Sequence, residues 1–153
     1  MARGDVKFFA SFLRASKAGV AFNLATDVIK LGIATSTIVP TVGTVDPRWG
    51  VIAGGTDFSA NQVPVATGYA GPVTLASVTY TRTAGVDTFT AANVSIPQDA
   101  AGFTTGAYAI LYDFTVAGAY AIGFVDLGGP VGNVSGPLQI NWNASGIFTE
   151  TAA

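Results

Sequence analysis

Asp113 and Asp126, on one expected hairpin, are the side chains best placed for acid–base chemistry. The chain has no cysteine and no histidine, which excludes thiol nucleophiles, Ser-His-Asp triads and zinc sites built on Cys or His. A carboxylate pair that hydrolyses glycosides needs a separation of about 5 to 9.5 Å. Asp113 lies beside the turn and Asp126 about seven residues along the second strand, so roughly 20 Å separates them. The sequence therefore predicts no catalytic residues and a protein that is not an enzyme.

Oxygen-bearing side chains in loop segments are candidate calcium ligands. They are Asp46, Asp57, Asn61 and Asp99. Their spacing matches no calcium-binding loop, in which several carboxylates lie within a short span. The glycine-rich stretch 128–132 lacks a following Lys-Ser/Thr pair and leads into a strand, so it predicts a plain turn and not a phosphate loop. We expect no metal and no cofactor.

A long, glycine- and proline-rich stretch, residues 40–72, is predicted to be a loop that holds one or two short strands. Long loops in compact domains are usually functional or ordered by a partner, so we expect residues 40–67 to make the main partner contacts. The candidate partner-binding residues are Asp46, Arg48, Trp49 and Phe58. The aromatic rings of Trp49, Phe58 and Tyr69 have three interpretations: a sugar-stacking platform, an anchor for a protein, or a cover for the core.

The N-terminal residues 1–19 are predicted to form a short amphipathic helix or arm, capped by Gly19. Its apolar residues are Phe8, Phe9, Phe12 and Leu13. Polar and charged residues interrupt this segment, and no later apolar run reaches about 18 residues. We therefore expect neither a cleavable signal peptide nor a membrane span.

Alternating apolar residues predict antiparallel strands along the rest of the chain. The expected strands cover 27–35, 73–82, 86–90, 94–96, 107–112, 119–127 and 138–143, and a turn leads from the last of them into residues 147–148. The runs 107–112 and 119–127 form a central hairpin. Alternation places Tyr108, Ile110, Tyr112, Tyr120, Ile122 and Phe124 on one face and Ala107, Ala109, Ala121 and Gly123 on the other. The small residues of the second face predict the docking surface of the N-terminal helix.

Composition supports a mainly β fold in one domain, residues 1–153. The 19 glycines and 7 prolines favour turns and strands over helices. We predict an antiparallel β-sandwich or barrel with a short N-terminal helix and one long loop. Only 10% of the residues are charged and the net charge is -2, which excludes a nucleic-acid-binding surface. A surface with so little charge suits a protein that packs against other subunits.

The order of several motifs resembles a group of small structural proteins of tailed bacteriophages. The motifs are Phe8-Phe9-x-Ser11-Phe12, Asn23-Leu24-x-x-Asp27-Val28-Ile29-Lys30-Leu31, Gly68-Tyr69, Tyr108-Ala109-Ile110-Leu111-Tyr112, Gly123-Phe124-Val125-Asp126-Leu127-Gly128, Ile140-Asn141-Trp142-Asn143 and Gly146-Ile147-Phe148. This resemblance covers most of the chain, although the loop 40–67 is longer and more apolar than the group usually has. It implies a virion protein and, by analogy with the β-sandwich cement proteins of phage heads, a capsid decoration protein.

Two functions follow as expectations. The first is a homotrimeric decoration or cement protein that is made in the host cytoplasm, lies on the capsid surface and binds across neighbouring major capsid protein subunits. The second is a tail or fibre component that binds a host glycan or protein through the loop aromatics. Neither function involves a nucleic acid or a membrane.

Overall fold

The computed structural model describes residues 5–151 of the chain. Its centre is a five-stranded antiparallel sheet in the order β1-β10-β9-β2-β5. The strands are β1 (Lys7–Phe8), β2 (Ile29–Ala34), β5 (Val73–Thr74), β9 (Gly106–Asp113) and β10 (Ala121–Val131). The three inner strands are buried along most of their length, because other parts of the chain cover both faces of the sheet. This sheet contains the predicted central hairpin, β9–β10, and the predicted strand 27–35.

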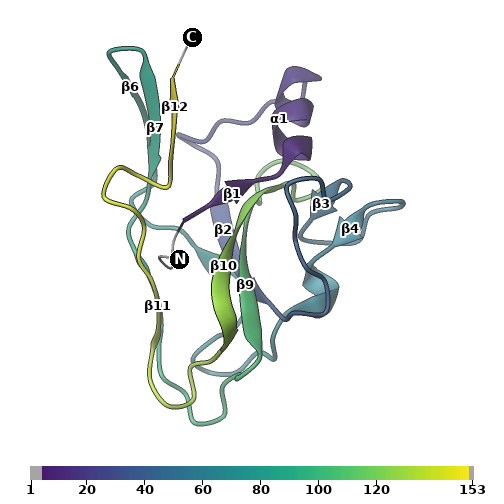
Figure 1. The fold of residues 1–153 in the computed structure, drawn as a ribbon, viewed down its shortest axis with the longest axis vertical. Helices are drawn as coiled ribbons and strands as arrows, with labels where there is room; N and C mark the ends of the chain where they lie inside the picture. The colour runs from purple at the N-terminus through teal and green to yellow at the C-terminus, as the bar shows by residue number, and fades with distance from the viewer. Residues whose placement is uncertain (1–4, 152–153) are drawn as a thin grey trace.

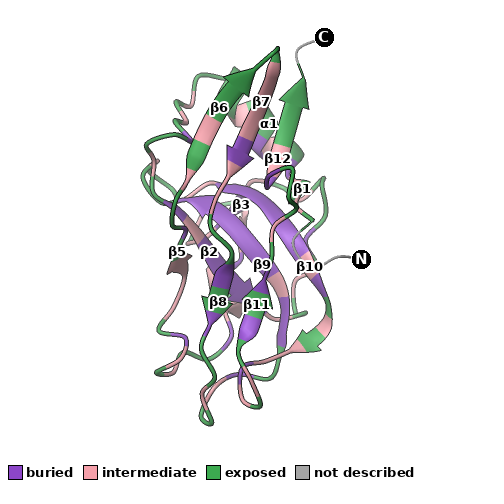
Figure 2. Cartoon of the chain, turned by 90° about the vertical axis from the view of Figure 1, so that its left-hand side faces the viewer, coloured by how far each residue is buried: buried purple, intermediate pink, exposed green. Residues whose placement is uncertain are grey.

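A bent antiparallel ribbon covers one face of the central sheet (Figure 2). Its strands are β6 (Thr79–Thr83), β7 (Val86–Thr90), β8 (Val94–Ile96), β11 (Leu138–Ile140) and β12 (Phe148–Thr151). β8 pairs with β11, and β7 lies between β6 and β12. The β8–β11 pair lies in front of the sheet, whereas β6, β7 and β12 extend beyond its end, beside the helix α1 (Ala10–Lys17).

The long loop covers the opposite face of the central sheet (Figure 1). It contains β3 (Pro47–Arg48), β4 (Thr56–Asp57) and the 3-10 helix η1 (Ser59–Asn61). β3 and β4 pair in parallel, so the prediction of one or two short strands in this loop is confirmed. The fold is mainly β, with several antiparallel sheets and one short α-helix, and has a sandwich-like arrangement as the sequence predicts.

The helix is shorter than predicted at its N-terminal end. Residues 1–4 of the expected helix lie outside the described residues, and β1 occupies Lys7–Phe8 as an edge strand that pairs with Phe124 and Gly123. The C-terminal prediction is confirmed, because Gly19 has a φ of 96° and the N–H of Val20 donates to the carbonyl of Ala15 across the helix end. Among the described residues, no helix has the length and apolar character that crossing a membrane requires.

The predicted docking surface of the helix is wrong. Phe9 packs against Phe124 and Phe58, with ring centroids 5.2 and 5.8 Å away. Phe12 packs against Phe22 at 4.8 Å. The helix therefore lies at the end of the sheet, near the long loop, and the β8–β11 pair covers the opposite face.

A β-bulge explains part of this error. Ala121 pairs with Tyr112 and Gly123 pairs with Leu111. Between these two pairs, β10 therefore has one residue more than β9. Strict alternation from 119 to 127 places Ala121 on the wrong face, because a bulge reverses the side-chain alternation beyond it.

Two other local predictions are wrong. The expected strand 73–82 is split between two sheets, since Ser77 has a φ of 52° and turns the chain between β5 and β6. The expected turn at 128–132 lies largely within β10, where Gly128 and Gly129 have φ values of 80° and 122° and form an irregular bulge. Both departures occur where the backbone adopts a left-handed conformation inside an extended pattern.

Phe12→Ala tests the packing of the helix on its own chain. Phe12 is buried, so its truncation should lower the free energy of unfolding by about 3 to 5 kcal/mol. Arg14→Ala, on the exposed side of the same helix, should change it by less than about 0.5 kcal/mol. Denaturant melts of both variants check this. A Phe12→Ala protein that unfolds like the wild type would mean that the helix does not contribute to the core.

Candidate functional site

Trp49 attaches the long loop to the central sheet. Its indole lies over Gly32 of β2, where a side-chain Cβ would overlap the ring. The indole stacks on Tyr112 of β9, with a centroid distance of 5.4 Å and an interplanar angle of 5°. The backbone N–H of Trp49 donates to the carbonyl of Ala119 at 3.0 Å. Glycine at position 32 therefore provides the space in which this ring packs.

Phe58 and Tyr69 are also part of the core. Phe58 has no exposed surface, and its ring lies against Phe9. The hydroxyl of Tyr69 accepts a hydrogen bond from the backbone N–H of Ile33 at 2.9 Å, and burial raises the pKa of Tyr69 to about 12. The structure thus favours the third interpretation of the loop aromatics, a cover for the core, and leaves no free ring platform at Phe58 or Tyr69.

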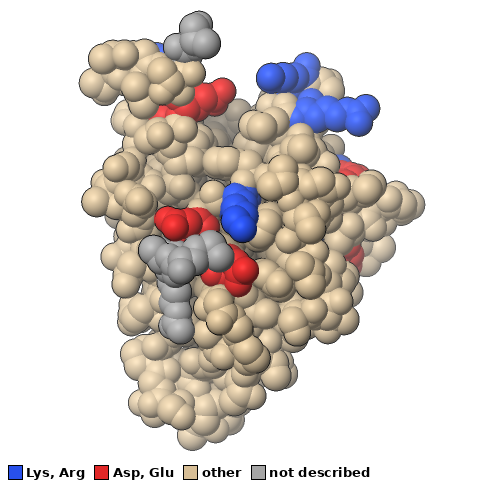
Figure 3. Space-filling view, viewed as in Figure 1, with Lys and Arg blue, Asp and Glu red and all other residues tan. Residues whose placement is uncertain are grey.

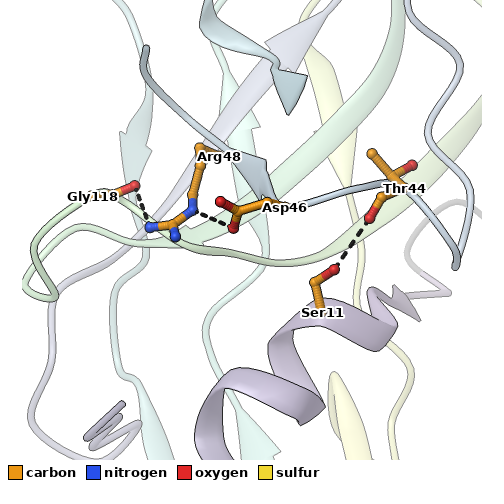
Figure 4. Close-up of polar contacts among 5 residues, drawn as sticks. All are labelled: Ser11, Thr44, Asp46, Arg48 and Gly118. Atoms are coloured by element: carbon orange, nitrogen blue, oxygen red, sulfur yellow. Dashed lines mark hydrogen bonds and ion pairs between the residues drawn. The ribbon is translucent and has the colours of Figure 1, made fainter. Parts of the chain in front are cut away.

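Arg48 is a buried charge with several partners (Figure 4). Its Nε donates to Oδ1 of Asp46 at 2.8 Å, and its Nη1 donates to the carbonyl of Gly118 at 3.1 Å. The guanidinium carbon lies 3.2 Å from the ring centroid of Tyr120, a cation–π contact. A buried guanidinium is stable only when its N–H groups and charge are compensated. Arg48 therefore holds the loop against the turn between β9 and β10.

Two hydrogen bonds connect the loop to the helix. The N–H of Ala10 donates to the carbonyl of Val42 at 2.9 Å, and the hydroxyl of Ser11 donates to the carbonyl of Thr44 at 3.2 Å (Figure 4). The loop is thus fixed at its start by the helix and further along by Trp49. It is an ordered part of the fold in the free chain.

The large apolar residues that this loop exposes are valines. Val42, Val45, Val51 and Val65 have exposed fractions of 53%, 66%, 96% and 57%. We call the three of them that lie within residues 42–51, Val42, Val45 and Val51, the valine surface. The four residues singled out from the sequence have two different roles. Trp49 and Phe58 pack into the core, while Arg48 and Asp46 form an ion pair with each other. The sequence analysis missed the valines because single exposed valines carry no motif.

Of the loop carboxylates considered as calcium ligands, Asp46 pairs with Arg48, and Asp57 and Asp99 bind backbone groups. Oδ1 of Asp57 accepts hydrogen bonds from the N–H groups of Gly50 and Ser59 at 3.0 and 2.8 Å. The N–H of Gly68 donates to Asp99 at 2.7 Å and holds the pKa of that carboxyl below its ordinary value. Within residues 5–151, no three side chains of Asp, Glu, His or Cys gather into a metal-binding group.

Asp113 forms a carboxyl pair that the sequence analysis missed. Its Oδ1 accepts hydrogen bonds from the N–H groups of Thr115 and Val116, at 2.9 and 3.0 Å. Its Oδ2 is buried and has no hydrogen-bond partner among the described residues, and the carboxyl of Asp27 lies nearby. Burial, and then the neighbouring Asp27, raise the pKa of Asp113 to about 6. Since the Asp113 side chain is fully buried, a substrate has no access to it, and the pair joins the segment before β2 to the end of β9.

The pair considered from the sequence, Asp113 and Asp126, is widely separated. Asp126 pairs with Tyr108, five residues before Asp113 on β9, which is about 17 Å along the strand. The two carboxyls do not form a catalytic pair.

No family model matches the chain, and no curated protein or solved structure matches it either. A function for the chain therefore has to follow from its own residues, motifs and surfaces.

Asp113→Asn should change how stability depends on pH. A carboxyl with a raised pKa in the folded state stabilises the fold below its unfolded pKa of 3.8, and this contribution is lost as the pH rises through about 6. Asparagine cannot ionise but keeps an oxygen for the two N–H groups. In denaturant melts at pH 7.5, the free energy of unfolding of the variant should therefore exceed that of the wild type by on the order of 2 kcal/mol. This difference should disappear near pH 4.

Asp5→Asn, at an exposed position, is the control and should show no such pH-dependent difference. Parallel stability curves for Asp113→Asn and the wild type between pH 4 and 7.5 would show that Asp113 does not titrate in this range.

Proposed function

We propose that this chain is a non-enzymatic structural protein of a bacteriophage virion, which decorates the capsid and stabilises it by binding across neighbouring major capsid protein subunits. The observation that carries the proposal is the valine surface, on a loop that Trp49, Arg48 and Phe58 hold on the central sheet. Exposed apolar side chains on an ordered support mark protein-interaction sites. A loop that is ordered before binding loses little conformational entropy when it docks.

Two sequence features support the same proposal. The low charge of the chain leaves a surface that a protein partner can cover without removing many charges from water. The ordered motifs resemble those of small phage structural proteins, and their implied location is the outside of the capsid. Many weak contacts, repeated by the symmetry of a shell, are sufficient for a cementing role.

The tail-fibre alternative receives less support. Its glycan-binding form depended on loop aromatics, and Phe58 and Tyr69 are buried in the core. Trp49 is only partly buried, but one face of its ring is stacked on Tyr112. We therefore place the partner contact on the valine surface and not on aromatic rings.

Deletion of residues 46–58 is unsuitable as a test of this loop. From the sequence alone, such a deletion is expected to abolish capsid binding and leave the melting transition nearly intact. The structure contradicts the second part, because the deletion would remove Trp49, Phe58 and Arg48 from the core. Point substitutions of exposed residues separate binding from stability.

Val51→Asp is the direct test of the valine surface. Its side chain is almost fully exposed, so the substitution should change stability by less than about 0.5 kcal/mol. Purified variant added to capsids that lack the protein should bind at least tenfold more weakly than the wild type, because docking would bury an unpaired carboxylate. Thr81→Asp, at an exposed position on β6, is the control and should bind normally.

Cryo-electron microscopy of the particles gives the readout. The proposal expects regular wild-type density over the capsid shell and its loss with Val51→Asp. Density confined to the tail would refute capsid decoration. Full decoration by Val51→Asp would show that the valine surface is not part of the contact.

A further inference from the structure

An apolar groove lies between the helix and the part of the ribbon that extends beyond the sheet. It has a volume of about 480 Å³. We call it the aromatic groove, and its floor consists of Phe8, Phe12, Phe22, Tyr80 and Phe148. Phe8 meets Phe148 edge-on, with centroids 4.6 Å apart, and Phe12 lies 4.8 Å from Phe22. The groove lies on a different part of the molecule from the valine surface and shares no residue with it.

The register of the three outer strands accounts for one wall. Tyr80, Phe89 and Phe148 are paired across β6, β7 and β12, so their rings share one face of this small sheet. Two residues further along each strand, the same face carries Arg82, Asp87 and Glu150. Arg82 and Asp87 neutralise each other in an ion pair of 3.1 Å. Glu150, which lines the groove, remains the uncompensated negative charge of this wall.

The helix forms the other wall and has the opposite charge. Lys17 lines the groove from the last turn of α1, and Leu13 lies on the same rim with 45% of its surface exposed. Figure 3 shows basic side chains above the helix and acidic ones across the hollow. No ion pair joins Lys17 to Glu150 or to any other carboxylate of residues 5–151.

We propose that the aromatic groove is the contact between two copies of this chain, related by a two-fold axis. In a two-fold contact the same patch faces itself, so a patch with one positive and one negative wall is complementary to its own copy. Lys17 of each copy then faces Glu150 of the other, and each Leu13 enters the partner's groove and covers the aromatic floor. A small apolar ligand with one charged group would complement only one wall, which favours a second copy as the occupant.

This inference does not depend on the proposed capsid role. It also differs from the trimer implied by the resemblance to phage cement proteins, because one two-fold contact builds a dimer. The two surfaces would then have separate tasks, self-association through the aromatic groove and attachment through the valine surface.

Charge reversal at the two walls tests the proposal. Lys17 and Glu150 are exposed, so Lys17→Glu and Glu150→Lys should retain the wild-type melting transition. Sedimentation equilibrium of the full chain, from about 1 µM to 1 mM, should give a wild-type dimer. Each single reversal should weaken dimerisation at least tenfold, because each leaves two like-charged pairs across the two-fold axis.

An equimolar mixture of the two single variants decides whether the contact is intermolecular. In the mixed dimer, the glutamate introduced by Lys17→Glu faces the lysine introduced by Glu150→Lys, and the unchanged Lys17 of one copy faces the unchanged Glu150 of the other. Both pairs across the axis are again oppositely charged, so association should return to within about threefold of the wild type. Arg14→Glu, on the same helix but outside the groove, is the matched control and should dimerise normally.

Three results would overturn the inference. They are a wild type that stays monomeric over the whole concentration range, a trimer or other oligomer that neither reversal weakens, and single variants that fail to associate when mixed. The last result would indicate that the groove binds a different occupant, such as an apolar small molecule or a capsid subunit.

Discussion

The packing of one tryptophan on one glycine organises the face of the sheet that the long loop covers. Gly32 lies in an inner strand, and the absence of a side chain there lets the indole of Trp49 approach the sheet closely and stack on Tyr112. Without this cover, the apolar face of β2 and β9 would be exposed to water, at a cost of about 25 cal/mol per Å² of apolar surface. The long loop is thus an outer layer of the core.

This arrangement explains how the protein can have both a stable core and a sparsely charged, apolar surface. Trp49, Phe58 and Arg48 point inward and fix the loop, whereas Val51 between them and Val42 and Val45 before them stay exposed. The same division recurs at the aromatic groove, where Phe12 is buried but Leu13 is not. In both places ordered apolar side chains face solvent, and the two proposed contacts rest on these side chains.

Most of the fold could be predicted from the sequence, because the inner strands have long apolar runs and their turns have distinct residues. The central hairpin, the strand at β2 and the cap at Gly19 follow from such local patterns. The bulge at Ala121 and the turn at Ser77 could not be predicted, since tertiary pairing determines them and nothing in the local pattern marks them.

Less of the candidate site could be predicted. The loop and its aromatic residues were identified, but composition does not tell which side chains of a loop face inward, and Trp49 is equally typical of cores and interfaces. The pairing of Asp27 with Asp113 joins residues far apart in sequence. The same holds for the two walls of the aromatic groove, which come from the N-terminal helix and from the much later strands β6 and β12.

Hydrogen–deuterium exchange of the isolated wild type and of Gly32→Ala would show whether the indole of Trp49 holds the long loop on the sheet. In the wild type, we expect slow exchange at the amides of Trp49 and Phe58, which donate to Ala119 and Arg48. In Gly32→Ala, where the added methyl group displaces the indole, protection should be lost in residues 40–58 and kept in β9 and β10. Fast exchange of these two amides in the wild type, or unchanged protection in the variant, would mean that the loop does not depend on this packing.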